Sequence, residues 1–409
     1  MPEQQGFDLR TRHGRVDDGG YYRLSDYELA TGWVCGFDSP TLPSDLSVNT
    51  SPRAAFEAAL LPALQRSPCV VAFSGGRDSS AILAVATHLA RRHGLADPVA
   101  ATHDFAGHAH ADESRFQELV IRDLKLREWY RFRDAEGCDV LGERARRGLR
   151  THGLLWPAMV HGHAPMVELA AGGGSIVTGE GGDEILGEQR ITTVRHAIRN
   201  RRPSRRTARM LVDSLAPKAE RRRSLRRQLR AVGMHPWLRR DVAEDFVERL
   251  ARDLADGPLR WDAAVLRHSG RRCVTMTALN FRRIFATDDV SYHEPFLEPG
   301  FLQAIGRAGG WSGWLTRTSM MQMLFGDVLP DEICRRNEKA EFGGVAVGES
   351  SRAFLAGWSG EGLDSDVVDI EAFRREVQRE NPLFGVQMLL QTAWLTTARR
   401  RPPVASETP

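Results

Sequence analysis

Residues 69–80 read CVVAFSGGRDSS, and this stretch decides the fold class. Its apolar half, Cys69–Phe73, has the length of a buried parallel strand. The polar half places glycines and hydroxyls directly before a predicted helix, in which Ile82, Val85 and Leu89 are spaced for burial on one side. A strand, a glycine-rich loop and a helix in this order predict one unit of a parallel α/β sheet.

Similar patterns surround this unit. A helix is predicted from Pro52, because Ser51 is a good N-cap and proline suits the first helical position. Further strands are predicted at Val99–Thr102, Trp129–Phe132 and Ser175–Thr178, with a helix at Asp112–Leu124. Strands that alternate with helices imply a parallel sheet flanked by helices. Beyond Arg190 the patterns are helical, with almost no strands.

The predicted organisation has four parts. Residues 1–50 form a short N-terminal extension, and residues 51–190 form the α/β core. Residues 191–400 form a mainly helical lobe that completes the domain, and residues 401–409 form a disordered tail.

The composition is that of a globular protein, with 42% hydrophobic and 27% charged residues among 409. The first ten residues, MPEQQGFDLR, lack the apolar core of a signal peptide, and no uninterrupted apolar run is long enough to span a membrane. The five cysteines are scattered without a CxxC pair, which argues against a disulfide framework and a structural zinc site. We therefore expect a cytoplasmic protein that does not contact a membrane.

The loop after the first strand is predicted to bind a nucleotide. Gly75 and Gly76 would let the backbone approach a phosphate closely, and the following helix N-terminus adds N–H donors. Asp78 would repel a bare phosphate, so its presence implies a bridging cation, most simply Mg²⁺. The loop is not a Walker A motif, because the GK[ST] ending is missing. A serine- and glycine-rich turn is the alternative. In the nucleotide-binding interpretation, further donors are the hydroxyls of Ser74, Ser79 and Ser80.

SGGRDSS after an apolar strand resembles the PP-loop of the N-type ATP pyrophosphatases, which have an adenine nucleotide alpha-hydrolase-like fold and cleave ATP to AMP and pyrophosphate. Residues 177–184, VTGEGGDE, look like the GEGxDE motif of asparagine synthetases, and residues 295–298, PFLE, look like their PFLD region. Their late LP…R…K..F signature is similar to Leu329-Pro330…Arg336…Lys339…Phe342. The resemblance covers roughly residues 65–345 and joins several separate motifs.

This resemblance implies ATP and Mg²⁺ as cofactors. A substrate carboxylate would attack the α-phosphate of ATP to give an acyl-adenylate, and an amine would then displace AMP to form an amide. Asp78 and Asp183 would hold Mg²⁺, and Glu180 would take the proton from the attacking amine. β-Lactam synthetases have a tyrosine at the position of Glu180. The residues expected at ATP or pyrophosphate are Ser74, Gly75, Gly76, Asp78, Ser79, Ser80, Thr102 and Gly179.

Lys339 is one of only three lysines in a chain that has 53 arginines among its 56 basic residues. A compact ammonium can approach a single oxygen as a point charge, which a planar guanidinium cannot do. By resemblance, Lys339 would stabilise charge at the phosphate and then at the tetrahedral carbon. An exposed lysine at a helix end is the alternative. For Arg336, support of the local fold and contact with phosphate both remain open.

The nitrogen source is predicted from the N-terminal part. Asparagine synthetases carry a glutaminase domain whose nucleophile is the cysteine after the initiator Met, whereas residue 2 here is proline and fewer than 70 residues precede the loop. We expect free ammonia, the product of another protein, or an amine of the substrate. The leading hypothesis is an amide- or lactam-forming ligase of natural-product or peptide biosynthesis. The alternatives are an ammonia-dependent asparagine synthetase and a nucleotide-binding partner protein without catalysis.

Other features give weaker signals. The segment Arg190–Arg240 holds 17 basic residues and two acidic ones, which is typical of a docking surface for an acidic peptide or carrier protein, or of a solvated helical face. Nucleic acid is not favoured, because Trp237 is the segment's one aromatic residue. A homodimer stays open. Two H-x-H pairs are predicted to be loop histidines rather than metal ligands: His108 with His110, and His161 with His163. Tyr292, His293 and Glu294 are candidates for substrate contact or for core packing.

Overall fold

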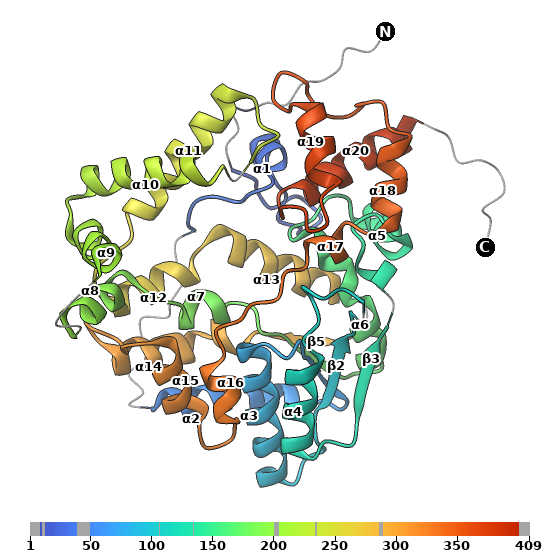
Figure 1. Cartoon of the computed structure of the whole chain (residues 1–409). Helices are drawn as coiled ribbons and strands as arrows, with labels where there is room; N and C mark the ends of the chain where they lie inside the picture. Colours follow the sequence, from blue (N-terminus) through green and yellow to red (C-terminus); the bar gives the residue numbers. More distant parts are fainter. Residues whose placement is uncertain are drawn as a thin grey trace.

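The computed structural model describes residue 9 and residues 13–38, 50–105, 107–133, 135–199, 204–233, 235–285 and 289–400. Within these residues, five strands form one parallel sheet in the order β3-β2-β1-β4-β5 (Figure 1). The strands are β1 (Cys69–Ala72), β2 (Val99–His103), β3 (Trp129–Phe132), β4 (Ser175–Val177) and β5 (Ser291–His293). The predicted α/β class with a parallel sheet flanked by helices and a helical lobe is therefore confirmed.

Alternation along the central strand explains why both faces of the sheet are covered. Val71 points into a core built with α2 (Pro52–Leu64), α3 (Arg77–His93) and α4 (Ser114–Leu124). Its neighbour Val70 points into the opposite core, built with α6 (Ala164–Ala170) and α13 (Arg272–Phe285). A central strand that is buried on both faces reads as a continuous apolar run, which is the pattern seen in the sequence.

The helix after β1 begins and ends as its sequence predicts. Gly76 is the N-cap of α3, and Gly94 follows it with a φ of 66°, a left-handed conformation that favours glycine. The preceding helix, α2, begins at Pro52, and the Ser51 side chain accepts a hydrogen bond from the Ala54 N–H. These caps fix where the loop between β1 and α3 starts and stops.

The fifth strand lies in the region predicted to be mainly helical. β5 pairs in parallel with β4, with Ser291 opposite Ser175 and Tyr292 opposite Ile176. It has only three residues, none of them aliphatic, so it carries no apolar run that a sequence pattern could detect. The α/β core is thus completed by a segment that follows more than 100 residues after β4.

A second apolar core unites the N-terminal segment with the C-terminal helices. Leu29, Ala30 and Val34 pack in it with residues of α11, α19 and α20 (Figure 1). Residues 13–38 are therefore built into this core, although the sequence predicted only an extension there. The helices not yet given are α1 (Asp26–Thr31), α5 (Glu143–His152), α7 (Gly182–Leu186), α8 (Arg190–Arg199), α9 (Arg205–Leu215), α10 (Lys218–Val232), α11 (Arg240–Ala255), α12 (Trp261–Ser269), α14 (Pro299–Gly309), α15 (Arg317–Phe325), α16 (Asp331–Arg335), α17 (Gly343–Ala346), α18 (Glu349–Ala356), α19 (Ile370–Val377) and α20 (Val386–Arg400), with short 3₁₀ turns η1 (Ala135–Cys138), η2 (Ala158–His163) and η4 (Pro295–Leu297).

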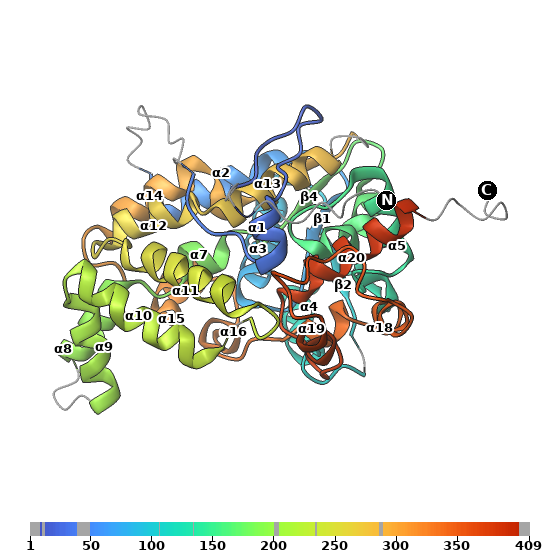
Figure 2. The ribbon, with the colours of Figure 1, turned by 90° about the horizontal axis from the view of Figure 1, so that it is seen from above.

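The arginine-rich helices lie at the periphery. α8 and α9 project from one corner of the molecule (Figure 2). Among the described residues, no helix is both long enough and apolar enough to cross a bilayer.

Candidate active site

The candidate site lies where the loops after β1 and β4 meet. These strands are neighbours in a parallel sheet, so their carboxyl ends open onto the same edge. A cavity of about 550 Å³ lies at this edge. Its walls come from the 74–80 loop, from residues 178–183, from the extended 336–342 segment and from Arg317 at the start of α15.

The 74–80 loop is held in one conformation by its own side chains and by α4. The Ser79 hydroxyl accepts from the Ser74 N–H at 3.2 Å and lies 3.0 Å from the Ser74 hydroxyl. Gly75 has a φ of +88°, and a Cβ there would lie only 2.8 Å from the Cγ of Gln117. Gln117 in turn donates from Nε2 to the Ser74 carbonyl at 2.9 Å. Glycine is therefore required at position 75 for both its conformation and its close packing.

Arg336 contacts this loop and helps to hold it in place. Its guanidinium is buried, donates to the Gly75 carbonyl at 2.9 Å and pairs with Glu113 at the start of α4. It also lies over the Phe116 ring, with Cζ 4.0 Å from the ring centroid. These contacts favour support of the fold over direct phosphate contact, although Arg336 also lines part of the cavity.

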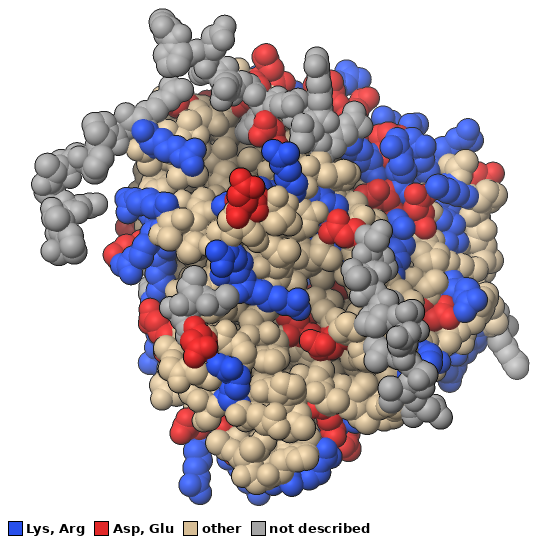
Figure 3. All heavy atoms as spheres, turned by 180° about the vertical axis from the view of Figure 1, so that it is seen from behind, with Lys and Arg blue, Asp and Glu red and all other residues tan. Residues whose placement is uncertain are grey.

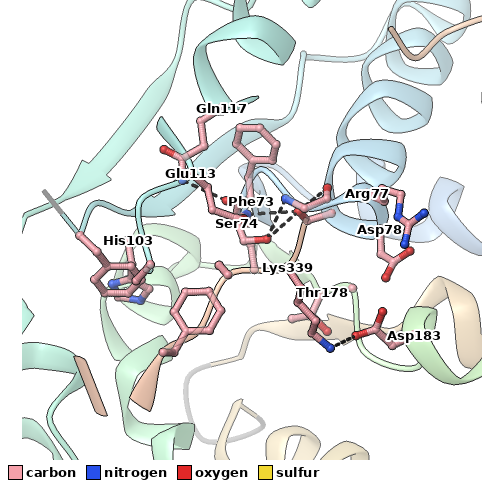
Figure 4. Close-up of a pocket in the computed structure, with 18 of the residues that line it drawn as sticks. Phe73, Ser74, Arg77, Asp78, His103, Glu113, Gln117, Thr178, Asp183 and Lys339 are labelled. Atoms are coloured by element: carbon pink, nitrogen blue, oxygen red, sulfur yellow. Dashed lines mark hydrogen bonds and ion pairs between the residues drawn. The ribbon is translucent and has the colours of Figure 1, made fainter. Parts of the chain in front are cut away.

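Two aspartates from different loops converge in the cavity (Figure 4). Arg317 donates to both oxygens of Asp78 at 2.6 Å and to Asp183 at 2.7 Å. Lys339 donates to the other Asp183 oxygen at 2.8 Å. A Cβ on Gly182 would lie 2.6 Å from the Cγ of Asp78, so glycine there lets the two helix starts approach each other.

The two carboxylates have different electrostatic surroundings. Burial raises the pKa of Asp78 above its usual range, and the Arg317 guanidinium only partly offsets this effect. Burial also acts on Asp183, but hydrogen bonds from Lys339 and Arg317 prevail and lower its pKa. The pair therefore needs positive charge close to it, which Arg317 and Lys339 supply in this structure.

The same pair fits Mg²⁺ by its donor chemistry. Mg²⁺ is usually bound by one or two carboxylates, with substrate phosphates and water completing its ligands. Asp78 and Asp183 supply two hard oxygen donors that one guanidinium already bridges. No cluster of three or more His, Cys, Asp or Glu residues that could hold a metal occurs in the part of the chain that the structure describes. A metal here would thus depend on phosphate oxygens as well.

Glu180 lines the cavity beside a second, buried carboxyl group. Burial and then the neighbouring Glu294 raise the pKa of Glu180 to about 8. Glu294 accepts a hydrogen bond from the Tyr292 hydroxyl at 2.6 Å and another from Arg282 at 3.1 Å. Burial raises the pKa of Glu294 to about 7, although these hydrogen bonds favour its charged form. The Tyr292 hydroxyl lies 3.0 Å from the Thr178 hydroxyl, which links this group to the loop that carries Glu180.

Most of the residues predicted from the sequence come together here. The ones that line the cavity are Ser74, Gly76, Asp78, Ser79, Gly179, Glu180, Asp183 and Lys339. Gly75 in the loop and Ser80 in the first turn of α3 are not among the lining residues, and the buried Ser80 hydroxyl has no hydrogen-bond partner among the described residues.

Thr102 is not brought to the cavity. It is fully buried, donates to the Phe73 carbonyl at 2.8 Å and accepts from Trp129 Nε1 at 2.9 Å. Its hydroxyl is thereby used to join β2 to the end of β1, because a buried hydroxyl must find partners. Tyr292, His293 and Glu294 are also not among the residues that line the cavity.

Arg317 and the apolar wall of the cavity were not predicted from the sequence. Arg317 is one of 53 arginines and stands in no recognised motif, so nothing in the sequence marks it. The wall includes Phe105, Met159, Met166 and Phe342, with His103 on the side away from the aspartates (Figure 4). His163, predicted to be a loop histidine, also lines the cavity, and burial lowers its pKa to about 4, so it is neutral near pH 7.

The comparisons with known proteins agree with this geometry. A family model described as asparagine synthase matches residues 53–395, which include every residue of the cavity described above. A comparison with curated proteins finds no match. The chain belongs to the asparagine synthase family, whose members are ATP-dependent ligases that form carbon–nitrogen bonds.

Proposed function

We propose that this protein adenylates a substrate carboxylate with ATP and then transfers the acyl group to an amine, forming an amide or lactam in natural-product or peptide biosynthesis. One observation carries the proposal. Asp78, Asp183 and Lys339 contact one another directly or through Arg317, and they share a single cavity with Glu180. Groups for two successive steps, adenylation and amide formation, thus surround the same space.

The first step, adenylation, would use the 74–80 loop together with Mg²⁺ and the Lys339 ammonium. Ser74, Gly76 and Ser79 line the cavity at the start of α3, where backbone N–H groups and hydroxyls suit a polyphosphate. Asp78 and Asp183 would hold Mg²⁺, which neutralises phosphate charge when bound. The largely exposed Lys339 ammonium can turn from Asp183 toward the α-phosphate, because one hydrogen bond at 2.8 Å is what holds it.

The second step uses Glu180. A general base works best when its pKa lies near the working pH, and the pKa of Glu180 is raised to about 8. Its carboxylate would accept the proton of the amine as the amine attacks the acyl carbon. Lys339 would then stabilise the negative oxygen of the tetrahedral intermediate.

The apolar wall favours an acyl substrate larger and less charged than aspartate. The side of the cavity away from the aspartates is lined by Phe105, Met159, Met166 and Phe342, together with the neutral His163. A small dicarboxylate would have to leave water for this wall without a charged partner there. An acyl group with an apolar body, together with the adenine ring, suits the wall better. An ammonia-dependent asparagine synthetase is therefore the second candidate.

ATP–pyrophosphate exchange tests the proposal. The protein is incubated with ATP, Mg²⁺ and labelled pyrophosphate, and single carboxylic acids are added, including aspartate and a series of acids with apolar bodies. We expect exchange that depends on an apolar acid and AMP release that depends on an added or internal amine. Exchange with aspartate alone would identify the asparagine synthetase. ATP binding without exchange for any acid would contradict catalysis and favour the nucleotide-binding partner.

A further inference from the structure

A second cavity, of about 1150 Å³, lies on another part of the molecule. It is formed by α5, α20 and residues in and just before α1, and it shares none of its lining residues with the candidate active site. α20 packs against both α5 and α1, and the three helices lie together in both ribbon views (Figures 1 and 2). The cavity is therefore bounded by the second apolar core rather than by the sheet.

The charged side chains that line this cavity are all basic, and its other polar lining residues are Thr151, His152 and Thr397. Arg146 and Arg150 of α5 and Arg399 of α20 line it, and no Asp or Glu occurs among its described lining residues. None of these three arginines forms an ion pair among the described residues. Arg23 also lines the cavity, but its charge is neutralised by Asp17 at 2.6 Å. Three positive charges thus face one space without a negative partner.

Two of these arginines flank one aromatic ring. The Cζ atoms of Arg146 and Arg150 lie 5.8 and 5.5 Å from the ring centroid of Trp394. Arg146 and Arg150 are four residues apart on one face of α5, where like charges destabilise a helix. The Nε of Arg146 is buried and has no hydrogen-bond partner among the described residues. A buried N–H without an acceptor is costly, so the protein alone does not satisfy Arg146. An anionic ligand would offset the repulsion between Arg146 and Arg150.

Most of the remaining lining residues are apolar. Leu29, Leu149 and Leu395 line the cavity next to the buried Trp394. Paired guanidinium groups suit the two oxygens of a carboxylate or phosphate, and an indole ring suits a flat apolar body. We propose that this cavity binds an amphipathic anion, with a carboxylate or phosphate head held by Arg146 and Arg150 and an apolar body packed on Trp394. This site stands on its own contacts and does not depend on the proposed ligase activity.

Three probes of one shape test the charge requirement. 1-Naphthoate carries a carboxylate, 1-naphthyl phosphate carries a phosphate, and 1-naphthalenemethanol carries no charge. Their binding to the full chain is measured by isothermal titration calorimetry, with and without saturating ATP and Mg²⁺. We expect at least one anion to bind about tenfold or more tightly than the alcohol, and ATP to leave this binding unchanged. The tighter anion identifies the head group.

Two variants test whether the anion binds at Arg146 and Arg150. The double variant Arg146→Gln/Arg150→Gln is expected to weaken anion binding about tenfold or more while leaving binding of the neutral alcohol unchanged. Arg147→Gln is the matched control, because Arg147 lies on the same helix, is exposed and pairs with Glu143 at 3.5 Å. Equal affinity for all three probes, no binding of either anion, displacement by ATP, or unchanged binding in the double variant would each overturn the proposal. Thermal melts establish that the variants fold. The comparison of the three probes and the titrations with ATP use the unaltered chain, so they test the proposal even if a variant does not fold.

Discussion

We expect that arginine cannot replace the lysine at position 339 without loss of activity. Its ammonium donates to one oxygen of Asp183, while Arg317 already bridges Asp183 and Asp78. A second planar guanidinium at this point would compete for the same oxygens and would approach a phosphate less closely. The scarcity of lysine in the chain agrees with a chemical requirement at this residue.

We predict that Lys339→Arg lowers ATP–pyrophosphate exchange by about 100-fold or more, the size typical of losing one donor to a developing oxyanion. Lys218→Arg is the matched control, because Lys218 is exposed and pairs with Asp256 outside the cavity. Near-normal exchange in Lys339→Arg would show that any positive charge suffices. Exchange assays on both variants, at matched ATP occupancy, make the comparison.

A substitution at Glu180 should distinguish adenylation from amide formation. We predict that Glu180→Gln retains exchange within about threefold but lowers amide formation by about 100-fold or more, since general-base catalysis typically contributes that much. Exchange reports adenylation alone, and product formation from acyl-adenylate and amine reports the second step. If exchange disappears together with amide formation, Glu180 acts in adenylation and the assignment as base is wrong.

At the scale of elements, β5 positions Glu294, which adds to the effect of burial on the charge of Glu180. The strand carries Tyr292 to the edge of the sheet, and the adjoining Glu294 lies close enough to raise the pKa of Glu180. The negative charge of Glu294 therefore raises the pH at which Glu180 ionises. Because burial raises the pKa of Glu294 itself to about 7, this influence is strongest above that pH.

We predict that Glu294→Gln shifts the rise of amide formation with pH to lower pH and increases the rate severalfold at pH 7. In the proposed mechanism ionised Glu180 is the active form, and removal of a neighbouring negative charge lowers its pKa. The glutamine oxygen can still accept the Tyr292 hydrogen bond, whereas the ion pair with the largely exposed Arg282 is lost. Single-turnover rates between pH 6 and 9 give the profile. Glu188→Gln, an exposed change just after α7, should leave the midpoint in place, and an unchanged midpoint in Glu294→Gln would exclude the proposed coupling.

The elements that could be predicted from the sequence are those with local signals. β1, with its apolar run, and α3, with glycines at both ends, are where the pattern places them. The short β5 could not be found, because parallel pairing with β4 decides it rather than its own residues. Arg317 and Thr102 show the same limit in the site, since the position of a side chain relative to the cavity depends on packing between elements distant in sequence.

At the scale of the whole molecule, the basic segment 190–240 is partly neutralised by the protein itself. Arg226 pairs with Glu248 of α11 at 3.2 Å, and Arg230 pairs with Glu244 of the same helix at 3.7 Å. Lys and Arg side chains gather on the side of the molecule that α10 and α11 occupy, with acidic side chains among them (Figure 3). The local excess of charge is therefore smaller in the folded protein than in the sequence. An acidic peptide or carrier-protein partner for this segment stays a prediction.

The N-terminal segment belongs to the folded unit even though the family match begins at residue 53. Glu28 of α1 and Arg272 of α13 form an ion pair in which both side chains are buried. Glu28 also accepts from the N–H groups of Gly14 and Ser25, each at 3.0 Å, and Arg272 donates to the Cys35 carbonyl at 3.1 Å. One buried pair thus ties the start of the chain to the helix that leads into β5.

We predict that Glu28→Gln lowers the free energy of unfolding by about 3 kcal/mol, because it removes the buried carboxylate that pairs with Arg272. The partly exposed Asp38, 3.8 Å from the Arg272 Nε, would be the carboxylate that remains near this buried charge. Glu143→Gln removes an exposed pair with Arg147 and should cost less than about 0.5 kcal/mol. Thermal melts followed by near-ultraviolet circular dichroism measure both variants. Equal melting temperatures for the two would mean that the N-terminal segment is not part of the cooperative fold. A lower melting temperature for Glu28→Gln with unchanged ATP affinity would instead show that this segment stabilises the second core while the nucleotide site forms independently of it.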